Sequence, residues 1–243
     1  MNHLLTVLFL SILAFGLCFK GLTYKKLRRK YLLLFFVIFI VDQLLGRLPK
    51  MLPMLNIIGG QYNWSGKILA ALFSIMIIII LKKHYQLDFA FTFKQFPNSV
   101  KSILGIIIGV FIFQIIFIYF RTPKQDITWE DHLFQLTLPG ISEEIMFRGI
   151  LLGLLNGVFI SRIKILGAYL GWGTVVTALL FGLWHGITFD KDLNLEINYF
   201  KMITPLFVGF LFAWIRERTK SILIPVIYHN LANELLMIIP LIK

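Results

Sequence analysis

The sequence predicts an all-α, polytopic membrane helix bundle with about eight transmembrane helices. Composition is the first reason: 58% of the 243 residues are hydrophobic and 15% are charged, whereas a soluble domain carries about 25% charged residues. The second reason is that long apolar runs recur along the whole chain. The third is that basic residues stand between those runs, so the net charge of +12 reflects membrane topology rather than a nucleic-acid-binding face.

The apolar runs approach the length of about 20 residues that a helix needs to cross a bilayer. The shorter runs predict tilted helices or a locally thinned bilayer. No internal repeat or soluble linker separates them, so we expect residues 1–243 to form a single membrane domain. The predicted spans are residues 4–19, 31–48, 65–81, 103–120, 133–159, 174–189, 202–215 and 222–239.

The first run, residues 4–19, is expected to be a retained membrane anchor. A secretory signal peptide carries basic residues before its apolar stretch and a small-residue cleavage site after it. Here a basic cluster, residues 25–30, follows the run instead. Cys18 is the single cysteine of the sequence, which leaves no possibility of an intramolecular disulfide or a thiolate metal cluster.

The loops between the runs predict the orientation in the membrane, because lysine and arginine concentrate in cytoplasmic loops. Basic and acidic loops alternate, which places both termini outside. The basic loops contain Lys25, Lys26, Arg28, Arg29, Lys30, Lys82, Lys83, Arg162, Lys164, Arg216, Arg218 and Lys220, and the acidic loops contain Asp126, Glu130, Asp131, Asp190, Asp192 and Glu196. The Lys-, Ile- and Phe-rich composition and the lack of an organelle signal indicate a bacterial plasma membrane.

Charged side chains inside the runs indicate where the chemistry lies, because each costs about 2.5–3.5 kcal/mol at the centre of a membrane helix. Most of them fall in the second half of the chain. His3, His84 and His132 lie at span ends or in loops and are expected to be solvated. The ionisable residues counted inside the runs are Asp42, Glu143, Glu144, Arg148, His185, His229 and Glu234.

Glu143 and Glu144 are adjacent carboxylates in an otherwise apolar helix. Glu144 and Arg148 are four residues apart and are expected to pair on one face. Glu143 points about 100° away around the helix, where it is free to face a histidine of another helix and accept a proton from water. Pro139 and Gly140 are expected to kink the helix and make room for that water. The alternative is a buried pair that only fixes packing, which leaves Glu143 uncompensated.

His185 lies in the next apolar run, with Phe181 one turn before it and able to pack against the imidazole ring. Gly182 and Gly186 allow another helix to approach closely. A histidine in this setting can take part in catalysis. Taken alone, a histidine on an apolar helix is more often a hydrogen-bonded core residue than a catalyst.

His229 and Asn233 are four residues apart in the last run and therefore share a helix face. Both side chains can hydrogen-bond a carbonyl oxygen or a water molecule. Pro225, upstream, is expected to bend this helix. The alternative is that the pair provides hydrogen bonds between helices without taking part in chemistry.

The three motifs, in this order in membrane spans, resemble the signature of the CPBP family, which groups the CAAX prenyl endopeptidases with bacterial Abi proteins. The resemblance covers about residues 130–240, the expected catalytic core, and the first 125 residues add only compatible hydropathy. It implies that Glu143 activates the hydrolytic water with help from His185. It also implies that His229 and Asn233 stabilise the oxyanion formed when water attacks the peptide carbonyl.

The resemblance gives Glu144 and Arg148 a supporting role and leaves two possibilities for the cofactor. Family members are commonly described as metalloproteases, and Glu143, His185 and His229 would form a reasonable zinc set with an open position. The sequence lacks the His-Glu-x-x-His helix of ordinary zinc proteases, and a metal-free glutamate mechanism needs the same residues. We favour the metal-free mechanism, with zinc as the alternative.

The expected function is therefore an intramembrane endopeptidase that cleaves a peptide or small membrane protein near the bilayer. Among the substrates that the resemblance offers, peptide pheromones and bacteriocin precursors, or a role in self-immunity, suit a bacterial membrane better than prenylated peptides. Helix depths predict a site near the midplane or inner leaflet, open toward the cytoplasm. The alternative is a non-enzymatic membrane protein, either a proton-coupled transporter or a bacteriocin-immunity scaffold, because buried ionisable residues occur there too.

Overall fold

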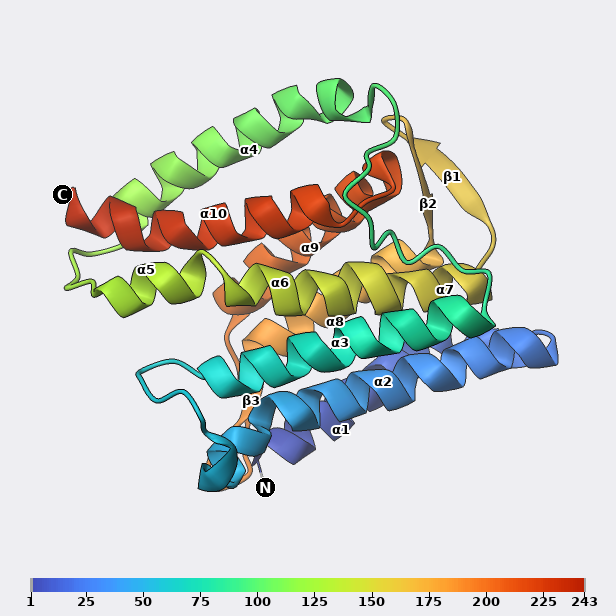
Figure 1. The fold of residues 1–243 in the computed structure, drawn as a ribbon, viewed down its shortest axis with the longest axis horizontal. Coiled ribbons are helices and arrows are strands. Elements are labelled where there is room, and N and C mark those ends of the chain that lie inside the picture. The colour runs from blue at the N-terminus through green and yellow to red at the C-terminus, as the bar shows by residue number, and fades with distance from the viewer. Residues whose placement is uncertain (1, 243) are drawn as a thin grey trace.

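The structure is a computed structural model that describes residues 2–242, and its helices lie side by side in one bundle (Figure 1). The all-α class is confirmed, with two small hairpins added. The helices are α1 (Asn2–Cys18), α2 (Lys26–Met51), α3 (Trp64–His84), α4 (Ser99–Arg121), α5 (Trp129–Gln135), α6 (Leu138–Glu144), α7 (Leu152–Val158), α8 (Trp172–Gly186), α9 (Tyr199–Thr219) and α10 (Leu223–Leu241), with short helical segments η1 (Phe19–Thr23), η2 (Pro53–Leu55) and η3 (Ile145–Leu151).

Among the described residues, six helices are long and apolar enough to cross a membrane: α1 with η1, α2, α3, α4, α9 and α10. The two other predicted spans correspond to shorter helices. Residues 133–159 divide into several segments, and α8 has 15 residues, which gives a length of about 22 Å against a hydrocarbon core of about 30 Å. The expectation of about eight crossings therefore holds approximately, and the two short crossings are the ones that carry the acidic motif and His185.

The segment predicted as one span over residues 133–159 begins with a break. Helix α5 ends at Gln135, and α6 starts at Leu138 with Pro139 in its first turn. Proline starts the helix here instead of kinking it, because its ring clashes with the carbonyl four residues earlier and it lacks an N–H group. The irregular part lies further on, where η3 is a π-helical stretch. Such π-segments often occur at functional sites.

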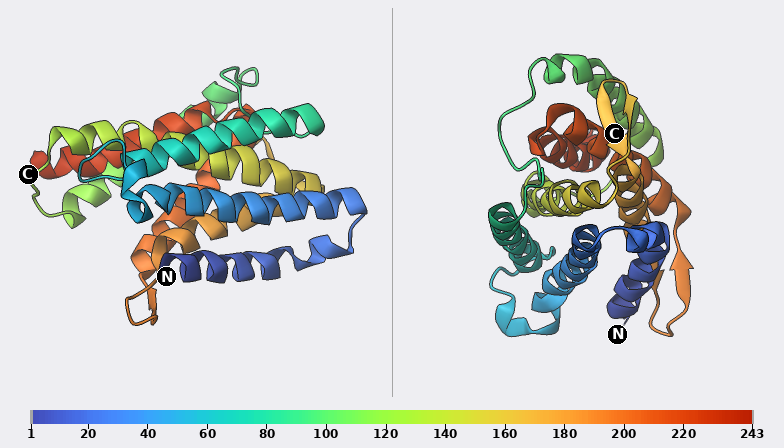
Figure 2. Two further views of the ribbon diagram at one scale, coloured as in Figure 1. Left: turned by 60° about the horizontal axis from the view of Figure 1, so that its bottom comes forward. Right: turned by 90° about the vertical axis from the view of Figure 1, so that its right-hand side faces the viewer.

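The segment from α6 through η3 to α7 lies at the centre of the bundle, as the end-on view in Figure 2 shows. It contacts α3 on one side and α10 on another, and α7 packs against α2 and α8. All seven residues of η3 are buried. By contrast, α4 is an outer helix in which only Ser99, Ile103 and Ile118 are buried, so nearly all of its surface is available to lipid.

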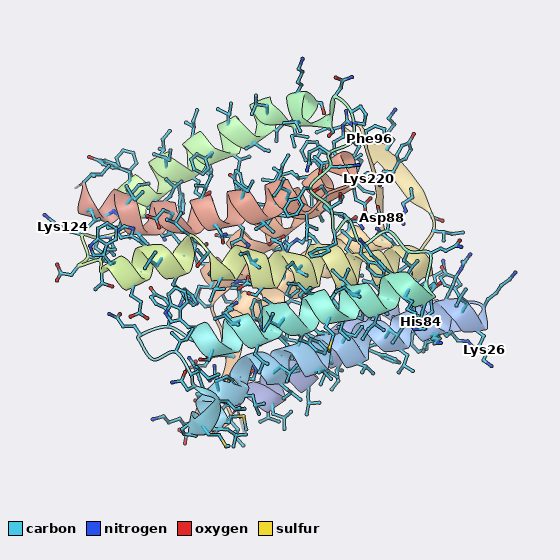
Figure 3. All side chains as sticks on the ribbon, viewed as in Figure 1. Lys26, His84, Asp88, Phe96, Lys124 and Lys220 are labelled. Atoms are coloured by element: carbon cyan, nitrogen blue, oxygen red, sulfur yellow. The ribbon has the colours of Figure 1, made fainter. Side chains whose placement is uncertain are left out.

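Labelled residues mark the two ends of the bundle in Figure 3. Lys26, His84 and Lys220 lie at one end, here called the basic end, and Lys124 lies at the opposite end. Both termini lie on the side of Lys124, here called the terminal end (Figure 1). This arrangement agrees with an even number of crossings.

Two antiparallel hairpins were not predicted from the apolar runs. Strands β1 (Arg162–Ile165) and β2 (Ala168–Gly171) pair at the basic end, and β3 (Ile187–Phe189) and β4 (Leu195–Ile197) pair after α8. The first hairpin turns through Leu166 and Gly167, whose φ angles are 45° and 81°. Successive positive φ angles match the right-handed twist of paired strands, but leucine at such a position gives little sign of the turn in a sequence.

Candidate active site

Three helices bring Glu143, His185 and His229 together inside the bundle. Glu143 lies in α6, His185 in the last turn of α8 and His229 in the second turn of α10. Glu143 Oε2 lies 3.8 Å from His185 Nε2 and 3.9 Å from His229 Nε2. The sequence motifs are therefore adjacent in space, as expected from their positions in apolar spans.

Glu143 Oε2 is buried and accepts no hydrogen bond from any of the described residues. A buried carboxylate oxygen without a donor is rare in folded proteins, and it calls for a water molecule or a ligand. The distances to the two imidazole nitrogens leave room for a small molecule that touches all three groups. This oxygen is therefore the point of the candidate site at which a water molecule or a ligand is expected to bind.

The hydrogen bonds of the two histidines fix their protonation pattern. His185 Nδ1 lies 2.7 Å from the carbonyl oxygen of Phe181, and a carbonyl oxygen can only accept, so Nδ1 carries the hydrogen. His229 Nδ1 lies 2.8 Å from Glu144 Oε1 and donates to that carboxylate in the same way. In their neutral forms, both rings therefore present an unprotonated Nε2 to Glu143. Phe181 also packs against His185 at a centroid distance of 4.5 Å, as predicted.

Glu144 and Arg148 form the expected ion pair. Glu144 Oε2 lies 3.1 Å from Arg148 Nε, and both side chains are almost completely buried. The contact is close in distance but not aligned as a hydrogen bond. Arg148 also donates from Nη2 to the carbonyl of Gly209 at 3.2 Å, and its guanidinium lies 4.2 Å from the centre of the Phe181 ring. Glu144 thus connects Arg148 to His229 and holds the imidazole in place.

Lys67 completes the site and was not singled out from the sequence. Its Nζ lies 2.5 Å from Glu143 Oε1 and 5.6 Å from the centre of the Trp184 ring. Lys67 stands in the first turn of α3, inside the predicted span over residues 65–81. Its position inside an apolar run could have identified it from the sequence, because a membrane-embedded charge needs a partner of opposite sign.

A cavity of about 230 Å³ opens beside Glu143 and Lys67. Its wall contains His3, Gly46, Arg47 and Asn63, which belong to the ends of α1, α2 and α3 at the terminal end. The cavity therefore lies toward the terminal end, and the opening of the site toward the cytoplasm stays a prediction. His185 is in the last turn of α8 and Lys67 in the first turn of α3, so the helices that meet at the site end at different heights.

Asn233 does not line this cavity, and no described residue hydrogen-bonds its side chain. The neighbouring Asn230 makes the structural contacts of this motif instead. Its Oδ1 accepts from the Gly140 N–H at 2.8 Å, and its Nδ2 donates to the Thr137 carbonyl at 3.0 Å. A Cβ on Gly140 would lie 2.4 Å from Asn230 Oδ1. Gly140 therefore allows α10 to approach α6 closely, and its expected role in making room for water is wrong.

Two histidines that were expected to be solvated have defined partners. His132 Nδ1 lies 2.5 Å from Glu234 Oε1 and joins α5 to α10, away from the cavity. His3 Nε2 lies 3.2 Å from the carbonyl of Gln43 and lines the cavity. The third histidine, His84, is exposed as expected. A helix end is solvated only where no other part of the protein packs over it, and the sequence does not show which ends are packed in this way.

Asp42 is the charged residue of the first half of the chain that the sequence did identify, and it also lines the cavity. It is buried. Its carboxylate receives Gln43 Nε2 at 3.1 Å and Ser74 Oγ at 3.4 Å. No ion pair to Asp42 occurs among residues 2–242.

The resemblance implies a zinc set of Glu143, His185 and His229. The unprotonated Nε2 atoms have the chemistry of metal ligands. However, no group of three or more His, Cys, Asp or Glu side chains within residues 2–242 is arranged to hold a metal ion, and the Lys67 ammonium already neutralises Glu143. As arranged, these residues do not fit the implied zinc site.

Comparison with known proteins finds a family match in the same region that carries the three sequence motifs. Residues 125–235 match the family model described as Type II CAAX prenyl endopeptidase Rce1-like. No curated protein and no solved structure matches the chain. The matched segment contains Glu143, His185 and His229 and ends before the close of α10, and it does not include Lys67 or Asp42. Over residues 125–235, the chain is thus similar to the CAAX protease (CPBP) family.

Proposed function

We propose that this protein is an intramembrane endopeptidase in which Glu143 activates a water molecule for attack on a peptide bond. The observation that carries the proposal is the buried Glu143 Oε2, which lacks a donor among the described residues and faces two imidazole Nε2 atoms from other helices. A water molecule at this point can donate one hydrogen to the carboxylate and the other to an imidazole. The carboxylate then acts as the general base.

The remaining polar groups position this reaction. His185 orients the water through Nε2 while its Nδ1 is held by the Phe181 carbonyl. Glu144 and Arg148 hold the ring of His229. The resemblance assigns oxyanion stabilisation to His229 and Asn233, and this assignment stays a prediction for both residues, neither of which lines the cavity wall.

The substrate class follows from the walls of the site. The cavity is enclosed by α1, α2, α3, α6, η3 and α8, so it admits an extended peptide segment but not a folded chain. We place the protein in a bacterial plasma membrane with both termini outside, because the Lys/Arg bias favours a cytoplasmic basic end. Peptide pheromones and bacteriocin precursors are the substrates that suit this setting.

A proton-coupled transporter or immunity scaffold is the competing function, and one observation favours the transporter. Asp42, Lys67 and Glu143 line one cavity in sequence from α2 through α3 to α6, and chains of buried ionisable groups also carry protons. The two functions differ in a direct test. A transporter would acidify proteoliposomes without cleaving peptide, whereas a protease would cleave without moving protons.

The experiment is to incubate the purified protein with a panel of membrane-associated peptides and to compare wild type with Glu143→Gln by mass spectrometry of the products. We expect cleavage of at least one peptide by the wild type. The variant keeps the size and shape of the side chain and one acceptor oxygen but cannot take up the proton, so its cleavage should fall by about 10²–10⁴-fold. Cleavage at the wild-type rate by a folded Glu143→Gln protein would contradict the proposal.

A further inference from the structure

The ammonium of Lys67 makes the shortest contact to the Glu143 carboxylate. Its Nζ lies 2.5 Å from Oε1, and the Lys67 and Glu143 side chains are 23% and 10% exposed. The water site proposed above is at the other oxygen, Oε2. Lys67 and that water therefore contact neighbouring oxygen atoms of one carboxylate. A substrate carbonyl whose carbon faces the water would have its oxygen close to the ammonium.

An oxyanion needs a hydrogen-bond donor, and the expected donors are occupied or distant. The neutral forms of His185 and His229 present lone pairs at Nε2, so these atoms accept rather than donate. Arg148 is engaged by Glu144 and by the Gly209 carbonyl. Asn233 is not part of the cavity wall. Among the described residues, the side chain that donates to Glu143 is Lys67.

Asp42 is a second carboxylate near Lys67 and could help to stabilise its ammonium away from Glu143. Both residues line the same cavity. The Asp42 carboxylate is buried and is contacted by the neutral groups of Gln43 and Ser74, with no ion pair within the described part of the chain. When Asp42 is ionised, its carboxylate stabilises an ammonium in this cavity, because Coulomb attraction is strong in a medium of low dielectric constant.

We propose that Lys67 is a catalytic residue that transfers its hydrogen bond from Glu143 to the carbonyl oxygen of the scissile peptide bond and stabilises the oxyanion. This inference rests on the proposed endopeptidase function. In the resting protein, the ammonium holds Glu143 as a weak base. When the Lys67 ammonium donates to the substrate carbonyl instead, the Glu143 carboxylate loses a charge-assisted hydrogen bond and accepts a proton more readily. Substrate entry thus activates the base and supplies the oxyanion donor in one movement.

The step balances with the residues present. The water oxygen bonds to the carbonyl carbon as one of its protons passes to Glu143 Oε2, and the π electron pair moves to the carbonyl oxygen, which accepts from Lys67 Nζ. On collapse, that pair forms the C=O bond again and the C–N bond breaks, with its electron pair going to nitrogen. The proton held by Glu143 passes to the leaving amine. Lys67 keeps its proton throughout.

The first test compares Lys67→Met with Lys201→Met. Lys201 is the matched control because it is an exposed lysine in the first turn of α9. Loss of one oxyanion donor costs about 10²–10³-fold in kcat, so we expect that loss for Lys67→Met, with a smaller rise in KM, because the hydrogen bond to the carbonyl oxygen strengthens as the oxyanion forms. Lys201→Met should match the wild type. A kcat for Lys67→Met close to that of the wild type, in a preparation where Glu143→Gln is inactive, would overturn the role of Lys67 and leave the endopeptidase assignment intact.

Chemical rescue separates a donor from a merely structural charge. In Lys67→Ala, added ethylammonium should restore a measurable part of kcat, whereas tetramethylammonium should not, because it carries the same charge but has no N–H group. Equal effects of the two ions, or rescue by neither, would overturn the proposal. If the single variants fail to fold, Lys67→Met combined with Asp42→Asn removes one charge of each sign. That folded double variant should still lose about 10²–10³-fold in kcat, and a kcat near the wild-type value would again overturn the proposal.

Discussion

At the residue scale, Glu144 and Arg148 form a buried ion pair whose removal should affect stability and activity differently. Breaking such a pair leaves an unpaired buried charge and costs about 3–5 kcal/mol. We therefore expect Glu144→Leu and Arg148→Met each to lower the free energy of unfolding by that amount. The double variant should recover most of the stability but little of the activity, because His229 loses the carboxylate that holds it.

The measurement is a double-mutant cycle of unfolding in detergent, with peptide cleavage measured on the same preparations. Coupling between the two positions is the expected result, since residues in direct contact are not additive. Losses that simply add in the double variant would show that the 3.1 Å contact does not stabilise the fold.

The cofactor is a second prediction at this scale. Because Glu143 is neutralised by Lys67 and the donor set does not fit zinc, we expect purified wild-type protein to contain much less than one equivalent of metal. Its activity should survive treatment with a strong chelator. Elemental analysis of wild type and His185→Ala, followed by assay after chelation, checks this. About one equivalent of zinc in the wild type, lost together with activity in His185→Ala, would require a metal-based mechanism.

Sequence reasoning found most of this site at the residue scale, but it missed Lys67 and gave Asn230 no role. Glu143, Glu144, Arg148 and His229 were recognisable because charge inside an apolar run needs a reason. Lys67 obeys the same rule, yet a lysine near a span end is usually solvated by extending toward the membrane surface. Its contact with Glu143 joins two residues far apart in the chain, and no local pattern encodes such a contact.

At the element scale, the short helix α5 is joined to the start of α3 by Glu130. Its carboxylate accepts from the backbone N–H groups of Gln61 and Tyr62 at 3.1 and 3.2 Å, and from Trp64 Nε1 at 2.9 Å. The hydrogen bond from Trp64, followed by those from the two backbone groups, lowers the pKa of Glu130 below its ordinary value of 4.5. This contact borders the terminal end, on the side where the cavity opens.

The lowered pKa predicts a pH dependence of this contact. The stabilisation is fully present above the ordinary value of 4.5 and is lost as the pH falls through the lower pKa of the folded state. Hydrogen exchange at the Gln61 and Tyr62 amides should therefore speed up on acidification below pH 4.5 beyond the intrinsic change in exchange. Glu130→Gln should remove most of this dependence. An unchanged profile in the variant would rule out Glu130 as the responsible group.

The elements themselves were largely predictable, because apolar runs of bilayer length have few alternatives to helices. The break between α5 and α6 was also encoded, since Pro139 cannot continue a helix that includes Gln135. The π-helical stretch η3 and the β1–β2 hairpin were not encoded in a readable way. Both depend on packing against neighbouring helices, and Leu166 in a left-handed conformation gives no recognisable turn signal.

At the scale of the whole molecule, the loop charges predict that the basic end faces the cytoplasm and that the cavity opens on the other side. Cysteines introduced at His84 and Lys124, which lie at opposite ends (Figure 3), can report this. In intact cells carrying Cys18→Ser, a membrane-impermeant maleimide should label Lys124→Cys and leave His84→Cys unlabelled until the cells are opened. The reverse pattern would invert the topology and place the cavity on the cytoplasmic side.

The first half of the chain also contributes to the cavity, although the family match begins at residue 125. Asp42 and Gln43 in α2 and Lys67 and Ala70 in α3 line it. Cleavage specificity should therefore depend on α2 and α3 as well as on the segment over residues 130–240 that carries the three motifs. A fragment limited to the family segment would lack one wall of the site.

The most direct test of the endopeptidase account is the cleavage rate of one substrate by wild type, Glu143→Gln, His185→Ala and His229→Ala, each first shown to be folded in detergent. Because the three side chains surround the proposed water at Glu143 Oε2, we expect each variant to lose about 10²–10⁴-fold in kcat. Near-normal hydrolysis by any two of the three variants would contradict the account.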